Sequence, residues 1–189
     1  MITVAIPTIP PRRLQLWRAL ESVDAQTMPA AAVVVAVDHW HDGAWTTRNR
    51  AARMSKTAWT AFLDDDDELL PHHLETLYRV AAEENADLVV PWFTVVGGTD
   101  PFPQDRGRQW DPQNPHVFPI TYLVRTSLLH AAMDVCGGFL PDEDGSWYFQ
   151  DGPLIETFVR LGGRVRCIPD ITWKWHHWGA NTSGLPGRW

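Results

Sequence analysis

Apolar residues along the chain alternate between short continuous runs and stripes with helical spacing. The runs occupy residues 2–6, 31–37, 58–63 and 86–90. Runs of this length are typical of strands that are buried on both faces, as in a parallel sheet. Stripes of apolar residues three or four positions apart follow the first three runs, and they predict helices that end near residue 26, cover 46–54 and begin near 71. The first half of the chain is therefore expected to form strand–helix–strand units.

The second half of the chain has a less regular pattern. Residues 97–119 hold five prolines and many polar side chains, which is typical of a long functional loop such as a lid or a wall of a binding site. Beyond this loop we expect a strand over 120–125, a helix over 126–135 closed by two glycines, an amphipathic helix over 151–161, and strands over 164–168 and 171–175. Together the two halves predict a single Rossmann-like α/β domain, with a central mixed, mostly parallel sheet flanked by helices.

Charge and composition narrow the classes of function and the compartment. The formal net charge of −7 argues against non-specific binding of nucleic acid. The two cysteines, Cys136 and Cys167, form no C-x-x-C motif and are most simply core thiols of a reducing compartment. No basic residues precede the first apolar run, and the longest run, residues 30–37, is too short to cross a bilayer. We therefore expect a cytoplasmic protein with no signal peptide and no membrane span.

Four consecutive aspartates, Asp64 to Asp67, follow the third apolar run. Carboxylates this close repel one another, by about 1 kcal/mol per pair in water at ~4 Å and more where water is excluded. Because side chains alternate along a strand, Asp64 and Asp66 are expected to share one face and to converge on a cation. Oxygen ligands suit Mg²⁺ or Mn²⁺. The alternative is a solvated acidic turn at the start of the next helix.

Polar residues follow the first three predicted strands in turn: Thr8, Asp38 and Asp64. Open α/β sheets bind ligands outside the carboxyl ends of their strands, so these side chains are expected to lie around one site. Neither G-x-G-x-x-G nor G-x-x-x-x-G-K-[ST] is present, so no glycine-rich loop is available to hold phosphate. A metal and an arginine are expected to do so instead.

Eight motifs in order resemble a known family, the GT-A-fold inverting glycosyltransferases of family two. They are VAIPT at 4–8, ALESVDAQT at 19–27, VVVAVD at 33–38, TRNRA at 47–51, FLDDDDELLP at 62–71, GGF at 137–139, FQDGPLIETFVRLGG at 149–163 and WHHWGANTSG at 175–184. The resemblance covers nearly the whole chain. It implies a single GT-A domain over 1–189, in which about 1–96 binds a nucleotide sugar and about 97–189 forms the acceptor side.

The resemblance also implies roles for particular residues. The nucleoside diphosphate sugar, most simply a UDP-sugar, would be bound by Pro7, Thr8, Asp38, Arg48, Asp64 and Asp65. Mn²⁺ or Mg²⁺ would be held by Asp66 and Asp64. A late histidine often completes the metal site in this family, and His176 and His177 are both candidates. Because adjacent residues of an extended segment face opposite ways, only one of the two is expected to reach the ion.

The family's general base is an aspartate that opens a late helix, and this position is Asp151 here. The preceding residue is Gln150, where the family usually has glutamate. Inverting transfer needs one base to deprotonate the acceptor hydroxyl, while the metal neutralises the leaving diphosphate. At a helix N-terminus Asp151 is expected to stay ionised and to be a modest base. The acceptor would be a glycan or another hydroxyl-bearing molecule. Because the chain is short for this fold, the acceptor side is expected to be minimal or to be completed by a partner subunit, as in a homo-oligomer.

Other interpretations remain open for the same residues. Asp151 could be a simple helix N-cap, Asp38 a turn residue and Arg48 a solvated charge. For the chain as a whole, Gln150 favours a non-catalytic module that binds a sugar or nucleotide. A sugar-1-phosphate nucleotidyltransferase would require a glycine in the loop after the first strand, and none is present there. A calcium-binding loop would require a D-x-D-x-D-G pattern, which is also absent.

Overall fold

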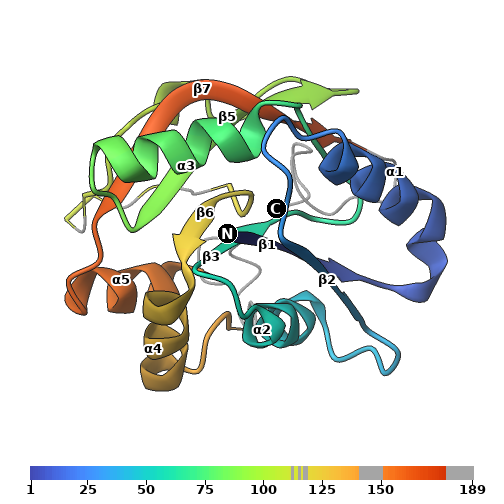
Figure 1. Ribbon diagram of the computed structural model, residues 1–189, viewed down its shortest axis with the longest axis horizontal. Coiled ribbons are helices and arrows are strands. Elements are labelled where there is room, and N and C mark those ends of the chain that lie inside the picture. The colour runs from blue at the N-terminus through green and yellow to red at the C-terminus, as the bar shows by residue number, and fades with distance from the viewer. Residues whose placement is uncertain (112, 115, 117–118, 141–150, 178–189) are drawn as a thin grey trace.

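The computed structural model describes residues 1–111, 113–114, 116, 119–140 and 151–177. Within these ranges one mixed sheet lies between two layers of helices (Figure 1). The strands are β1 (Ile2–Thr8), β2 (Ala32–Val37), β3 (Trp59–Phe62), β4 (Glu68–Leu69), β5 (Leu88–Val96), β6 (Leu123–Arg125) and β7 (Val165–His176). The helices are α1 (Arg13–Asp24), α2 (Ala44–Met54), α3 (His73–Glu83), α4 (Thr126–Cys136) and α5 (Gly152–Arg160), with short 3₁₀ turns η1 (Pro10–Arg12) and η2 (Pro103–Asp105).

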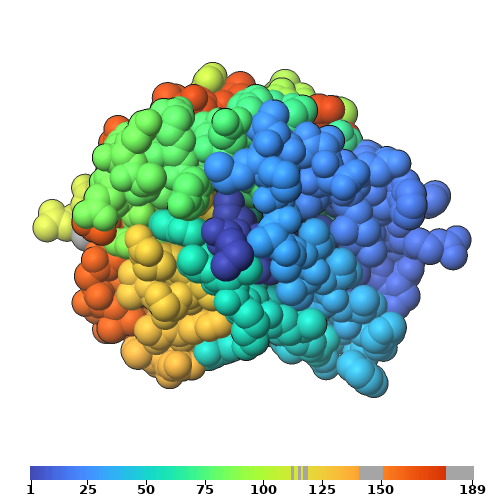
Figure 2. Space-filling view, viewed as in Figure 1, coloured from blue at the N-terminus to red at the C-terminus, as the bar shows by residue number. Residues whose placement is uncertain are grey.

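The strand order in the sheet is β2-β1-β3-β6-β5-β7-β4. The pairs β1–β2, β1–β3 and β5–β7 are parallel, whereas β6 runs antiparallel to β3 and β5, and β4 runs antiparallel to β7. The single α/β domain with a mixed sheet, expected from the sequence, is thus confirmed. The amino-terminal end of the chain lies at the centre of the face seen in Figure 2. Because β1 runs parallel to β2 and β3, the carboxyl ends of the three strands share one edge of the sheet.

Side-chain alternation along β1 divides the core into two layers. Ile2, Val4 and Ile6 pack in the layer that contains the apolar faces of α1 and α3. Ala5 packs in the other layer, with residues of α2, α4 and α5. Figure 1 shows α1 and α3 on one side of the sheet and the other three helices on the opposite side. The two-residue period of the strands and the 3.6-residue period of the helices therefore account for the layering.

β1 extends further than the sequence pattern predicted, because it does not stop at Pro7. Pro7 is paired with Ala36 of β2 and Thr8 with Val37. The carbonyl of Ala5 accepts a hydrogen bond from Leu63, so the backbone of residues 5 and 7 faces the β3 side. The β3 strand has already ended at Phe62. The nitrogen of Pro7 therefore faces a position beyond the end of β3, where the missing N–H leaves no strand acceptor without a partner.

The later strands also differ from the prediction. Residues 164–168 and 171–175 were expected to form two strands, but one strand, β7, runs through Pro169 with register shifts against β5. These shifts accommodate the interruption that the sequence suggested. The two-residue strand β4 was not predicted, because so short a run carries no periodicity.

The loop after β5 is fastened to β7. The side-chain amide of Gln109 donates to the carbonyl of Cys167 at 2.7 Å and accepts from its N–H at 3.2 Å. Arg106 donates to the carbonyl of Pro169 at 2.7 Å. These side-chain bonds hold this part of the loop against β7. None of the helices in the described ranges is long and apolar enough to span a membrane.

Asp87 connects the chain at the amino end of β5 to two other segments. Its carboxylate accepts from Arg125 Nε at 2.7 Å, from Arg164 Nε at 3.1 Å and from the main-chain N–H of Arg164 at 3.2 Å. Burial opposes ionisation, but these hydrogen bonds outweigh it and lower the pKa of Asp87. The guanidinium of Arg125 also lies 4.6 Å from the centre of the Trp59 ring.

Replacing Asp87 with asparagine should lower the free energy of unfolding at pH 7 by about 1–2 kcal/mol, because a charge-assisted network is lost. A lowered pKa stabilises the fold above the unfolded-state value of about 3.9, and this contribution is lost as the pH falls through the folded-state pKa. The effect of Asp87→Asn should therefore shrink below about pH 4. Chemical denaturation measures both quantities, with the exposed Asp170→Asn as control. A loss independent of pH would contradict the charge argument.

Candidate functional site

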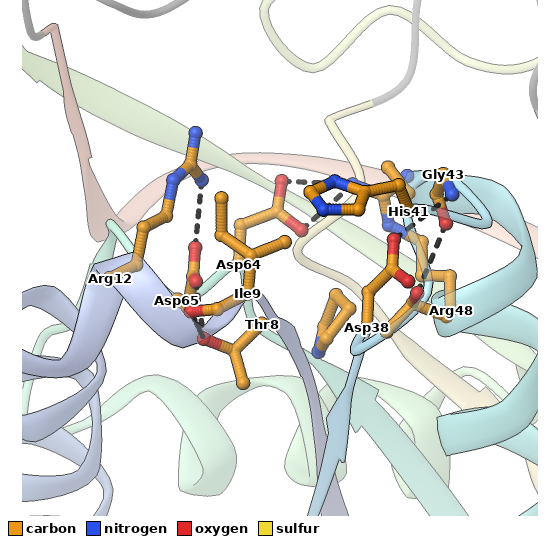
Figure 3. Close-up of a pocket in the computed structure, with 12 residues that line it drawn as sticks. Thr8, Ile9, Arg12, Asp38, His41, Gly43, Arg48, Asp64 and Asp65 are labelled. Carbon is orange, nitrogen blue, oxygen red and sulfur yellow. Dashed lines mark hydrogen bonds and ion pairs between the residues drawn. The ribbon is translucent and has the colours of Figure 1, made fainter.

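The carboxyl ends of β1, β2 and β3 surround a pocket of about 310 Å³. It is lined by Pro7, Thr8, Ile9, Arg12, Asp38, His41, Gly43, Ala44, Thr47, Arg48, Asp64 and Asp65. Figure 3 shows Arg12 and Asp65 on one side, Asp38, His41 and Arg48 on the other, and Asp64 between them. All six residues proposed from the sequence for nucleotide binding are thus brought together at one site.

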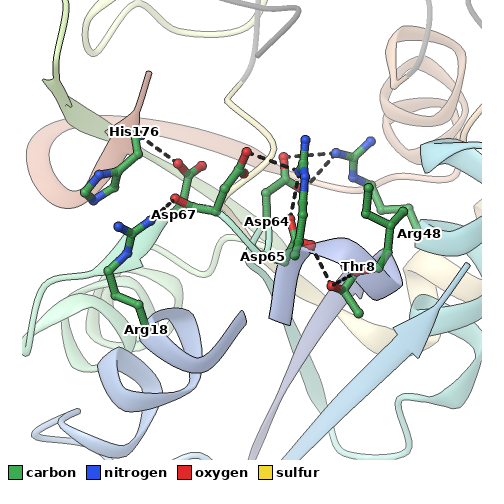
Figure 4. A network of polar contacts seen from close by, with 10 residues as sticks. Thr8, Arg18, Arg48, Asp64, Asp65, Asp67 and His176 are labelled. Carbon is green, nitrogen blue, oxygen red and sulfur yellow. Dashed lines mark hydrogen bonds and ion pairs between the residues drawn. The ribbon is translucent and has the colours of Figure 1, made fainter. Parts of the chain in front are cut away.

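The aspartate run forms a turn and does not continue β3. The N–H of Asp67 donates to the carbonyl of Asp64 at 3.1 Å, which closes the turn. The expected alternation of Asp64 and Asp66 against Asp65 and Asp67 therefore does not apply, because it requires an extended backbone. In the turn, the carboxylates of Asp64, Asp65 and Asp66 all meet arginine side chains. Figure 4 shows the run between Arg48 on one side and Arg18 with His176 on the other.

Arg48, on α2, is fixed by two kinds of contact. Its Nη2 donates to both carboxylate oxygens of Asp64, at 2.8 and 3.0 Å. The guanidinium carbon lies 6.0 Å from the centre of the Phe139 ring. Phe139 is held in turn by the side-chain amide of Asn49, which accepts from its N–H at 2.8 Å and donates to its carbonyl at 2.9 Å. This buried arginine is therefore a pre-positioned cation and not a solvated surface charge.

Arg12 binds the next two carboxylates. Its Nη1 lies 2.9 Å from Oδ1 of Asp65 and 3.1 Å from Oδ2 of Asp66. The other oxygen of Asp65 accepts a hydrogen bond from the hydroxyl of Thr8 at 2.6 Å. The loop after β1 thus contributes both a hydroxyl and a cation to the aspartate turn.

The protonation of the aspartate turn reflects burial and mutual repulsion. Burial, together with the charge of Asp64, raises the pKa of Asp66 to about 6, although Arg12 opposes the shift. Burial also raises the pKa of Asp65. The pKa of Asp67 is raised well above its usual range by burial and by the charges of Asp66 and Asp64. Such crowding is the property expected of carboxylates that share a cation.

Asp38 organises the loop after β2. Its carboxylate accepts main-chain hydrogen bonds from Trp40 at 3.2 Å, Asp42 at 2.9 Å and Gly43 at 3.0 Å. These bonds, led by that from Asp42, lower the pKa of Asp38. The turn interpretation is therefore correct locally, and the same loop places His41 and Gly43 on the pocket.

Asp151 precedes α5 and lies close enough to Arg48 to be affected by its charge. Its side chain makes no capping hydrogen bond, so it is not a simple N-cap. Burial raises the pKa of Asp151 to about 7, against the opposing charge of Arg48. The sequence led us to expect a low pKa and an ionised side chain, as is usual at a helix N-terminus. The pKa is higher because desolvation outweighs the helix dipole. Gln150 lies outside the described residues.

The two candidate histidines face different surroundings. The main-chain N–H of His176 donates to Asp67 Oδ1 at 2.9 Å, and its ring Nε2 lies 2.8 Å from Glu68 Oε1. The ring of His177 stands edge-on to Trp175, with centroids 4.7 Å apart. Within the described ranges no three His, Cys, Asp or Glu side chains are grouped so that they could hold a metal ion. Mg²⁺ at phosphate-binding sites is nevertheless usually held by only one or two carboxylates, and its remaining positions are filled by phosphate oxygens and water. Asp64 and Asp66 lie close enough for their charges to interact, so this pair of carboxylates fits such an ion.

The model of a protein family, described as glycosyl transferase family 2, matches residues 31–140, more than half of the chain. The chain belongs to glycosyl transferase family 2. The matched region contains Asp38, Arg48 and the aspartate turn, whereas β1 and Asp151 lie outside it. No curated protein sequence matches the chain significantly.

Solved structures show that this family 2 chain has the fold of S. aureus TarS. Residues 1–349 of TarS in complex with UDP-GlcNAc superpose with a TM-score of 0.76 at 19% identity, over 97% of this chain and 61% of that one. The same part of TarS in complex with UDP gives 0.73 at 18% identity, over 93% and 60%. The chain thus spans about three fifths of the length of these relatives.

Several residues at this family 2 site were missed by sequence reasoning. Arg12 was assigned no role, although its place in the loop after β1 could have identified it. Asn49 lies in a recognised motif but had no role until its contact with Phe139 was seen. Tyr122 is fully buried beside Asp151 and Arg48, whose charges act on its hydroxyl. Nothing in the local sequence signals that position.

Replacing Asp38 with alanine should release the loop over residues 40–43. The amides of Trp40, Asp42 and Gly43 lose their acceptor, so their hydrogen exchange should become about tenfold faster or more. Asp42→Ala is the matched control, because it removes the ion pair with Arg50 but leaves the Asp42 amide bonded to Asp38. Exchange measured by NMR or mass spectrometry should respond to the first variant only. Equal protection in both variants would contradict the role of Asp38.

Proposed function

We propose that this chain binds a nucleoside diphosphate sugar in the pocket at the ends of β1, β2 and β3 and transfers the sugar, with inversion, to a hydroxyl acceptor. The observation that carries the proposal is the convergence of Thr8, Asp38 and Asp64 with two arginines on one pocket of about 310 Å³. Such a site offers the polar edge of the sheet to the nucleotide base and the positive charge of the arginines to the diphosphate. The UDP and UDP-GlcNAc complexes of TarS support a UDP-sugar as donor.

Each part of the donor has matching residues. Pro7, Thr8 and Asp38 are assigned to the nucleoside, and Arg48, with its guanidinium fixed beside Asp64, to the diphosphate. Asp66 and Asp64 would hold Mn²⁺ or Mg²⁺, with His176 or His177 as a further candidate ligand. When bound, the metal would supply Lewis acidity that neutralises the charge of the leaving diphosphate.

Asp151 is assigned as the general base. Deprotonation of an acceptor hydroxyl is helped by a base whose pKa is near the working pH, and burial raises the pKa of Asp151 to about 7. The charge of Arg48 acts on the same carboxylate, so donor and acceptor chemistry share one cation. No second carboxylic acid is required, because the leaving group is a diphosphate.

A non-catalytic sugar- or nucleotide-binding module is the second candidate. It would need the pocket but would gain nothing from a carboxylate with a raised pKa, which costs stability at neutral pH. The perturbed pKa of Asp151 therefore favours the enzyme.

The free thiols Cys136 and Cys167 support a reducing, cytoplasmic compartment. We assign the acceptor side to residues of the second half, and a homo-oligomer could complete it.

UDP should stabilise the protein against heat only when Mn²⁺ or Mg²⁺ is present, because the metal links the diphosphate to the aspartate turn. At a ligand concentration about 100 times Kd the gain is roughly 2.7 kcal/mol, equivalent to several degrees in Tm. Asp66→Ala should abolish the shift, whereas Asp170→Ala, at an exposed position, should retain it. Equal, metal-independent shifts with every nucleotide would argue against this site.

Asp151→Asn should keep nucleotide binding but lower the rate of sugar transfer by 10²-fold or more, because general base catalysis contributes on the order of 10²–10⁴. Calorimetry with UDP and a transfer assay separate the two effects, and Asp24→Asn, at an exposed position, is the control. Because a raised pKa leaves Asp151 protonated below about pH 7, the wild-type rate should rise with pH through that value and then level off. Unchanged turnover in Asp151→Asn would remove this residue from its assigned role.

A further inference from the structure

We propose that Arg12 is a built-in counter-cation of the aspartate turn, and that a divalent metal ion must displace it in order to bind. The proposal rests on the proposed function, since it concerns the metal and diphosphate of the same site. Arg12 would then compete with the metal ion for the carboxylates, in addition to lining the pocket.

The contacts of Arg12 resemble those of a bound cation. A single nitrogen, Nη1, lies 2.9 Å from Asp65 Oδ1 and 3.1 Å from Asp66 Oδ2, so it bridges two carboxylates from different residues. The side chain of Arg12 is 36% exposed, whereas those of Asp65 and Asp66 are 3% and 12% exposed. The carboxylates are therefore fixed in the protein interior, while the cation that neutralises them can leave toward solvent.

Arg48 does not share this property. It binds both oxygens of one carboxylate, Asp64, and its side chain is only 10% exposed. The ring of Phe139 covers its guanidinium, and Asn49 fixes Phe139. Of these two arginines, Arg12 is thus the one that can exchange with another cation. It comes from the short turn η1, where Pro10 and Pro11 restrict the backbone, so exchange would have to occur by rotation of the side chain.

The charges at the site indicate why exchange would be useful. Asp64, Asp65 and Asp66 meet two guanidinium groups, which leaves a local charge of about minus one. A divalent cation alone would change this to about plus one, and a donor diphosphate with two negative charges would restore the first value. Once displaced, Arg12 remains at the rim of the pocket, where it can bind the diphosphate. Metal and diphosphate should consequently bind better together than separately.

The test is the affinity of the protein for Mn²⁺ in the absence of nucleotide, measured from free Mn²⁺ by electron paramagnetic resonance. Arg12→Gln removes the charge but keeps a hydrogen-bond donor, and Arg12→Ala removes both. We expect each to bind Mn²⁺ roughly tenfold more tightly than wild type, because a competing charge is lost. Arg13→Ala is the matched control, since it removes the same charge from the adjacent exposed position and should leave the affinity unchanged. Thermal unfolding of each variant checks that it is folded.

Mn²⁺ affinity in Arg12→Gln that equals or falls below the wild-type value would overturn the proposal, as would an equal gain in Arg13→Ala. Absence of Mn²⁺ binding in every variant would overturn it too. UDP affinity at saturating Mn²⁺ should fall in Arg12→Gln, because the variant has no cation at position 12 to bind the diphosphate. The failure of the proposed function and the failure of the counter-cation role can be told apart. If the wild-type protein binds no nucleotide, the proposed function is wrong. If it binds nucleotide but Arg12→Gln leaves the Mn²⁺ affinity unchanged, only the counter-cation role is wrong.

Discussion

The arrangement of the site depends on how the protein neutralises consecutive carboxylates at the end of a buried strand. Asp64 is paired with Arg48, and Asp65 and Asp66 are paired with Arg12. Buried charges are tolerated only when they are paired, so these contacts constrain the loop after β1 and the start of α2 together. Burial, together with the remaining repulsion from Asp64, raises the pKa of Asp66 to about 6. A site kept in this state is suited to bind a further cation together with a polyanion.

The fold delivers the groups that this balance requires. Parallel pairing of β1 with β2 and β3 brings three carboxyl ends to one edge, and β1 can reach Thr8 through Pro7 because β3 ends earlier. Asp38 then folds the next loop over the pocket through three main-chain hydrogen bonds. Asn49, on the same helix as Arg48, holds Phe139 in the core layer of α2, and the Phe139 ring lies against the Arg48 guanidinium. Stability and site geometry therefore depend on the same contacts.

Much of this could be predicted from the sequence, for reasons specific to each element. Short apolar runs located β1, β2 and β3, and strand polarity then placed Thr8, Asp38 and Asp64 at one edge. What could not be predicted depended on three-dimensional surroundings. Asp151 has its raised pKa because of burial, which no local pattern reports. The partners of Arg12 became visible only once the aspartate run was seen to be a turn, since a strand would have directed Asp65 and Asp66 to opposite faces.

The most direct test of this account is a crystal structure of the wild-type protein with UDP and Mn²⁺, in which anomalous scattering locates the metal. We predict a manganese peak between the carboxylates of Asp64 and Asp66 and the diphosphate, the nucleoside beside Asp38, and the guanidinium of Arg12 no longer bridging Asp65 and Asp66. Manganese bound elsewhere, or a nucleotide bound with the Arg12 bridge intact and no metal at the aspartate turn, would contradict it.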